Sequence, residues 1–175
     1  MKLKLIHEEI LINGSADKMW SVLSQYGDVS NFHAGVAESY KVEGSSNNAA
    51  LGCERVCNIV DLGLHITLKE RIIDYVEGQS YKYEVYEWKN FPIRAMFFGF
   101  KIIPQASNQT SLIINIEYKA KPAILTSLMA GKMRRLARDV LLGYKHFTET
   151  GVKRVPIKTL KTQYKSPKDI GVQYG

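Results

Sequence analysis

The stretch LGCERVCNIVDLGLHITLKERI, residues 51–72, contains two runs rich in alternating apolar and polar side chains, separated by a tight turn. This pattern predicts two antiparallel strands, 52–60 and 64–76, joined at Asp61–Gly63. If Leu62-Gly63 is a two-residue turn, Arg55 faces Glu70 across the ladder. A one-residue bulge at the turn would separate the two charges, so this pairing depends on the turn.

The chain on both sides of this hairpin predicts further strands and three helices. Ser15 is a suitable N-cap for a helix over 16–26, and a second short helix is expected over 28–33. Residues 122–151 predict a long helix of roughly 28 residues, because apolar side chains recur there every three or four positions. The remaining strands are expected at 2–13, 36–44, 80–89, 93–103 and 110–120.

This order of elements predicts an α+β fold built on a seven-stranded antiparallel sheet. A long sheet of this kind twists and therefore curls. The long C-terminal helix would lie over the concave face, and the two short helices would close one end. An internal cavity is expected beneath the long helix.

Composition and charge are those of a globular domain followed by a basic segment. Hydrophobic residues make up 45% of the 175 residues and charged residues 23%. The net charge is +7, of which residues 152–175 carry +5. We expect one domain over 1–151 and a basic tail over 152–175 that is flexible, or that contacts an anionic membrane.

The sequence lacks the motifs of several other functional classes. The four histidines are scattered, and Cys53 and Cys57 lie too far apart on one strand to form a disulfide, so no metal site is expected. Dinucleotide-binding, P-loop and serine-hydrolase motifs are absent, and no cofactor is expected. No nucleic-acid-binding motif is recognised. Neither a membrane-spanning segment nor a signal peptide is predicted, so a cytoplasmic location is expected.

The segments SADKMWSVLSQYGDVSNFHAGV and GCERV…KERI, together with the order of elements, resemble the START-like superfamily of polyketide cyclases/dehydrases and lipid-transfer proteins. This superfamily shares the helix-grip fold of the major birch pollen allergen and the plant abscisic-acid receptors. The resemblance covers residues 5–150 and implies an internal cavity for a hydrophobic or amphipathic small molecule. The residues that carry it are Trp20, Gly27, Phe32, His33, Gly52, Arg55, Glu70, Arg71, Tyr83 and Pro92.

The chain departs from the hormone receptors of this fold. It has DLGLH where those receptors have an S-G-L-P-A gate, and NFPIR in the neighbourhood of their His-Arg-Leu latch. A hormone receptor with a phosphatase partner is therefore not supported.

Strand alternation and the resemblance together define candidate ligand-binding residues. For strands 64–76, 80–89 and 93–103, the outward lysine and arginine side chains indicate which face is internal. For strand 110–120, hydrophobicity places Ile116 and Tyr118 inside, whereas the receptors would favour Glu117. For strand 52–60, the resemblance places Arg55 inside. The set is Arg55, Cys57, Ile59, Leu68, Glu70, Tyr81, Tyr83, Met96, Phe98, Phe100, Ile116, Tyr118, Met129, Met133, Leu136 and Val140.

These residues allow more than one interpretation. Arg55 and Glu70 form a structural pair, anchor the polar group of a ligand, or serve acid–base catalysis through Glu70. The inward aromatic side chains either line a cavity or fill a solid core. His33 is expected to cap or pack rather than to catalyse. A solvated helix face is expected from Lys132, Arg134, Arg135 and Arg138.

Three functions follow from these alternatives. Binding or transport of a hydrophobic small molecule is favoured. The second is a cyclase/dehydrase-type enzyme in which Glu70, Arg55 and Tyr83 position a polyketide-like substrate. The third is an interaction protein whose pocket is vestigial.

Overall fold

Seven strands form one antiparallel sheet in the computed structural model of the protein, which describes residues 2–61 and 63–164. Their order across the sheet is β1-β7-β6-β5-β4-β3-β2, which confirms the predicted α+β helix-grip fold. The strands are β1 (Lys4–Asn13), β2 (Glu38–Lys41), β3 (Glu54–Asp61), β4 (Leu64–Val76), β5 (Ser80–Lys89), β6 (Ile93–Ala106) and β7 (Gln109–Ala120).

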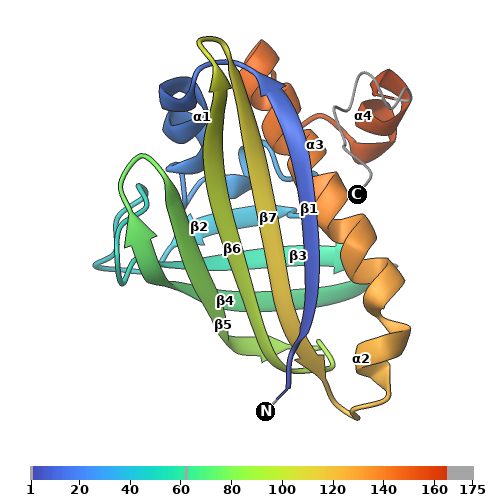
Figure 1. Cartoon of the computed structure of the whole chain (residues 1–175). Coiled ribbons are helices and arrows are strands. Elements are labelled where there is room, and N and C mark those ends of the chain that lie inside the picture. The colour runs from blue at the N-terminus through green and yellow to red at the C-terminus, as the bar shows by residue number, and fades with distance from the viewer. Residues whose placement is uncertain (1, 62, 165–175) are drawn as a thin grey trace.

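The sheet is strongly curled, and one long helix lies along its edge. In Figure 1, β6, β7 and β1 cross over β3 and β4 at a steep angle, and α3 (Ala130–Thr150) runs beside β1. Irregularities in the β4–β5 ladder, between Lys69 and Glu70 and between Ile72 and Asp74, accompany this curl. The concave face therefore encloses an interior that α3 closes along one side.

Two short helical elements close one end, as expected, but both are shorter than predicted. The first is α1 (Ala16–Leu23), whose N-cap Ser15 accepts a hydrogen bond from the Lys18 amide at 3.2 Å. The second, η1 (Val29–Asn31), is one 3-10 turn. None of the helices in the described part of the chain is long and apolar enough to cross a membrane.

The long C-terminal helix is interrupted, contrary to the sequence-based expectation. A short α2 (Leu125–Leu128) precedes α3, with Met129 at the junction. In an unbroken helix the Thr126 carbonyl would accept from the Ala130 amide, but here it accepts from the Tyr118 hydroxyl at 2.6 Å. The Thr126 side chain also accepts from the Ala120 amide at 3.0 Å. The end of β7 therefore holds α2 and breaks the helix.

The first part of the basic tail is also folded, which corrects the expectation of flexibility from residue 152 onward. Residues Ile157–Gln163 form α4, which Figure 1 shows beside α3. Leu160 is only 1% exposed, and the Tyr164 hydroxyl lies 3.2 Å from His146 Nδ1. Ile157, Leu160 and Tyr164 recur at helical spacing, so one face of α4 is apolar and packs on the core. Residues 165–175 lie outside the described residues.

Candidate ligand-binding site

Arg55 and Glu70 meet across the β3–β4 ladder, as the hairpin predicted. Arg55 is the register partner of Glu70, and Cys57 is the partner of Leu68. Arg55 Nε donates to Glu70 Oε2 at 2.5 Å, and each residue is only 3% exposed. The irregularity beside Glu70 lies in the ladder to β5, so it leaves the pairing with β3 intact.

Neighbouring groups enclose this ion pair. Arg55 Nη1 donates to the Tyr26 carbonyl at 2.8 Å, and the Cys57 thiol donates to Glu70 at 3.6 Å. The Arg55 guanidinium carbon lies 4.1 Å from the centre of the Tyr26 ring and 4.8 Å from that of Tyr83. Hydrogen bonds and cation–π contacts thus offset the cost of burying both charges. We call Tyr26, Arg55, Cys57, Glu70 and Tyr83 the interior polar cluster.

The electrostatics of this cluster disfavour a reactive thiolate or phenolate. Burial, reinforced by Glu70, raises the pKa of the Cys57 thiol well above its ordinary value. Burial likewise raises the pKa values of Tyr26 and Tyr83. For Arg55, burial lowers the pKa, but attraction to Glu70 outweighs this and holds the pKa well above its ordinary value. Near neutral pH the cluster therefore offers a cation, neutral hydroxyls and a neutral thiol.

The Tyr26 hydroxyl is the one buried side-chain polar atom without a hydrogen-bond partner in the described part of the chain. The neighbouring Tyr81 and Tyr83 rings have centroids 5.9 and 5.8 Å from the Tyr26 ring. A buried hydroxyl nearly always has a partner in a folded protein. An unpartnered one is therefore available to a water molecule or to a polar group of a ligand.

Aromatic side chains fill the interior next to this cluster. The Tyr83 ring stacks on Phe98 with centroids 5.1 Å apart, and Phe100 lies 5.6 Å from Tyr81 and 5.4 Å from Tyr144 of α3. At this level the interior contains interlocking side chains instead of the open hollow expected from the curl of the sheet. A ligand that reached Tyr26 would have to displace some of these rings.

The structure places the sixteen candidate residues in two groups. The buried ones lie on the inner face of the sheet or on the packed face of α3, while Ile59, Met129 and Leu136 are half-buried at its margin. Glu117 points outward and pairs with Lys82 at 2.8 Å, so periodicity was the correct guide on β7. The buried group is Arg55, Cys57, Leu68, Glu70, Tyr81, Tyr83, Met96, Phe98, Phe100, Ile116, Tyr118, Met133 and Val140.

His33 lies beside the interior polar cluster as a neutral side chain. The Gly35 amide donates to His33 Nδ1 at 3.1 Å, so the ring caps its own turn. The pKa of His33 is lowered from 6.5 to about 4, mainly by burial and to a smaller extent by the positive charge of Arg55. The hydrogen bond agrees with the expected capping role.

Acidification should therefore destabilise the protein through His33. Because its pKa is lower in the folded state, the unfolded chain binds this proton more readily. The stabilising contribution of His33 is complete above about pH 6.5 and decreases as the pH falls, and the loss of stability amounts to about 3 kcal/mol near pH 4. Urea denaturation at several pH values should show a weaker pH dependence in His33→Gln than in wild type. The exposed His7→Gln variant is the control, and equal pH dependence in all three proteins would refute the assignment.

Comparison with known proteins assigns the chain to a family. A profile of the family described as "Polyketide cyclase / dehydrase and lipid transport" matches residues 5–145. The chain belongs to this family. No curated protein sequence matches it.

Several solved structures share the fold of this polyketide cyclase/dehydrase and lipid transport protein. Their sequence identity to it is low. A START superfamily protein from Mycobacterium smegmatis has a TM-score of 0.66 and 12% identity, over 81% of this chain and 97% of that one. Ara h 8.0201 has a TM-score of 0.67 and 15% identity, over 83% of this chain and 97% of that one. The aromatase/cyclase ZhuI from Streptomyces sp. R1128 has a TM-score of 0.67 and 11% identity, over 85% and 98%.

Two interior residues of the protein, Tyr26 and Tyr144, were not among the candidates predicted from the sequence. Tyr26 extends the apolar stripe of the first helix, three positions after Leu23, and was assigned only to the helix end. Tyr144 follows Val140 by four positions on α3, so helical spacing could have identified it. Neither signal indicates that both side chains approach the same part of the sheet.

Proposed function

We propose that the protein binds or transports a hydrophobic or amphipathic small molecule that presents one hydrogen-bonding group to the interior polar cluster. The unpartnered hydroxyl of buried Tyr26, within an otherwise apolar and aromatic interior, carries this proposal. Membership of a family described by cyclases/dehydrases and lipid transport supports it. Lipid-like or polyketide-like molecules have the required combination of an apolar body and a few polar groups.

The two polar features of the site would have different roles. Arg55 already donates to Glu70 and to the Tyr26 carbonyl, so it serves mainly to hold Tyr26 and the cluster in place. The Tyr26 hydroxyl is free to donate or accept. The apolar body of the ligand would lie among candidate side chains such as Leu68, Phe98 and Phe100. The flexible Met96 and Met133 can repack as the aromatic rings move.

The contacts of Glu70 favour binding over catalysis. A general base must reach a proton of its substrate, whereas Glu70 is only 3% exposed and its Oε2 atom already accepts from Arg55 and from Cys57. The raised pKa values of Tyr26 and Tyr83 make their hydroxyls weak acids. The enzyme hypothesis is therefore the second candidate and is an outcome of the experiment below.

A matched pair of ligands tests the proposal. Naphthol and naphthalene have the same ring system, but only naphthol carries a hydroxyl. Tyr26→Phe should weaken naphthol binding about fivefold, the value of one net hydrogen bond, and leave naphthalene binding unchanged. The exposed Tyr40→Phe is the control variant. Titration calorimetry measures both affinities, and native mass spectrometry of the purified protein detects a copurified lipid.

Three outcomes would contradict the proposal. Wild-type protein that binds neither compound and carries no copurified molecule would support a packed, vestigial interior. Equal losses for naphthol and naphthalene in Tyr26→Phe would show that the hydroxyl makes no specific contact. Turnover of an aromatic polyketide would instead support the enzyme.

A further inference from the structure

Two large apolar side chains are exposed at the end of the molecule where α2 lies. Ile124 is 71% exposed and Leu128 is 72% exposed. They are four positions apart, and the Leu128 amide donates to the Ile124 carbonyl at 3.4 Å, so both lie on the same side of this helical turn. Neighbouring apolar side chains that are exposed together are typical of surfaces that bind other molecules.

A cationic cleft of about 460 Å³ lies directly beside these side chains. Arg94, Lys119 and Lys121 line it, and no acidic residue does. Within residues 2–61 and 63–164, none of these three cations forms an ion pair. The other residues of the cleft are Trp88, Ile93, Ala120 and Ala123.

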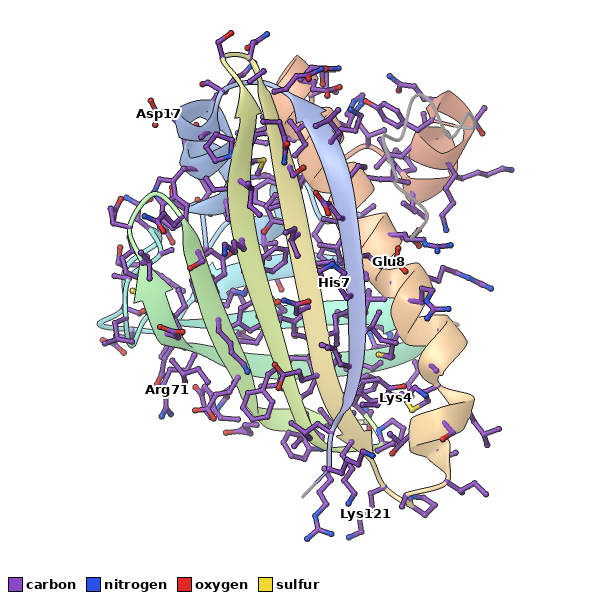
Figure 2. All side chains as sticks on the ribbon, viewed as in Figure 1. Lys4, His7, Glu8, Asp17, Arg71 and Lys121 are labelled. Atoms are coloured by element: carbon purple, nitrogen blue, oxygen red, sulfur yellow. The ribbon has the colours of Figure 1, made fainter. Side chains whose placement is uncertain are left out.

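The cleft and the apolar side chains belong to one contiguous surface. The Lys121 amide donates to the Pro92 carbonyl at 3.0 Å, which joins the β7–α2 linker to the β5–β6 turn. Ala123 lines the cleft and directly precedes Ile124. Figure 2 shows Lys121 at the end of the sheet next to α2. We call Arg94, Lys119, Lys121, Ile124 and Leu128 the α2-end surface.

A second cleft, lined by β1, α3 and Lys161 of α4, has a different electrostatic character. It also contains arginines, but Arg138 pairs with Glu8 at 3.0 Å, and Lys161 pairs with Asp139 at 2.8 Å. Figure 2 shows Glu8 facing α3. The apolar side chains of the neighbouring tail segment, Ile157 and Leu160 among them, pack against the core. In this region most cations are therefore paired with acids, Arg135 being an exception in the described structure, and the neighbouring apolar side chains of α4 are packed.

We propose that the α2-end surface docks the protein on an anionic phospholipid membrane. The three cations would contact lipid phosphates at the cleft, while Ile124 and Leu128 enter the interfacial layer. A nucleic acid would satisfy the cations but leave both apolar side chains in water, so the membrane fits both features. The inference goes beyond the proposed function, because docking does not depend on an interior ligand.

Vesicle binding tests this surface directly. Sedimentation should show that the wild-type protein binds phosphatidylcholine vesicles containing about 30% phosphatidylglycerol, more weakly as salt rises, and binds pure phosphatidylcholine poorly. The triple variant Arg94→Gln/Lys119→Gln/Lys121→Gln should lose on the order of 100-fold in affinity, about fivefold for each cation. The double variant Ile124→Ser/Leu128→Ser should lose at least about tenfold in vesicle affinity, because the two apolar side chains no longer enter the lipid. A tenfold change corresponds to about 1.4 kcal/mol of binding free energy. Circular dichroism verifies that both variants fold.

Matched controls separate docking from general attraction to a protein of net charge +7. Arg135→Gln/Lys153→Gln/Lys158→Gln removes the same charge elsewhere, and Leu51→Ser removes an apolar side chain that is 68% exposed. Both controls should bind within about twofold of wild type. Equal losses in the controls, losses confined to the Arg135 triple variant, or absence of wild-type binding would overturn the proposal. Preference for a short RNA or DNA duplex over vesicles would overturn it as well.

Discussion

Replacing Arg55 with Met should destabilise the protein by about 3–5 kcal/mol, the cost of removing one partner of a buried ion pair. The variant leaves Glu70 buried with the Cys57 thiol as its remaining side-chain hydrogen-bond partner in the described structure. Glu70→Gln should cost a similar amount, because it leaves the Arg55 charge without its carboxylate. The double variant should recover part of the loss, since it removes both charges. Chemical denaturation of all four proteins measures the coupling free energy.

An exposed ion pair between β4 and the next strand, β5, provides the control for this cycle. Lys69 and Glu87 form a pair at 3.0 Å on the outer face of β4 and β5, with side chains that are 38% and 60% exposed. Lys69→Met and Glu87→Gln should each cost only about 0–1 kcal/mol, because water screens an exposed pair. A coupling free energy below about 1 kcal/mol between Arg55 and Glu70 would contradict the prediction. It would show that the buried pair contributes no more to stability than an exposed pair does.

Gly143→Ala should destabilise the protein by about 3 kcal/mol, although alanine is the better helix former. A Cβ at Gly143 would overlap the carbonyl oxygen of Phe32 and lie 3.2 Å from its carbon. These are backbone atoms, so rotation of a side chain cannot relieve the overlap. The Phe32 ring is held between Tyr144 and Phe147, with centroid distances of 4.7 and 5.3 Å. Either α3 or the segment carrying Phe32 and His33 must therefore move.

Gly131→Ala is the matched control in the same helix. A Cβ at Gly131 meets no atom within 4 Å, so this variant should be more stable by up to about 1 kcal/mol through helix propensity. Thermal and urea denaturation compare the two variants. Similar stabilities would contradict the close approach of the Phe32 backbone to α3 at Gly143. A movement of Phe32 and His33 in Gly143→Ala should also weaken the pH dependence assigned to His33.

Local sequence predicted the inner face of the sheet well. In β5, charged and apolar side chains alternate, and in β6 the outward Lys101 sets the phase, so Tyr81, Tyr83, Phe98 and Phe100 were assigned inward and are buried. The same alternation placed Glu117 outside, against the resemblance, and Glu117 pairs with Lys82 there. The short turn after Asp61 set the register that brings Arg55 opposite Glu70. These features depend on neighbours within a hairpin or along one strand.

Other features depended on contacts between distant segments. The long helix breaks because Tyr118, at the end of β7, takes the Thr126 carbonyl. The basic tail folds as α4 because the core offers an apolar surface to Leu160. Tyr26 lies against Arg55, 29 positions away in the sequence, because α1 and η1 close the end of the curled sheet.

Sequence patterns were enough to predict the order of the strands, the inner faces of β4, β5, β6 and β7, and the register that pairs Arg55 with Glu70. The packing of aromatic rings against one another in the interior, and the absence of a partner for the Tyr26 hydroxyl among the described residues, follow from the three-dimensional arrangement of distant segments. Residue periodicity records whether a side chain is turned toward water or away from it. It does not record which other side chains it meets, because the curl of the sheet and the position of the helices set those distances.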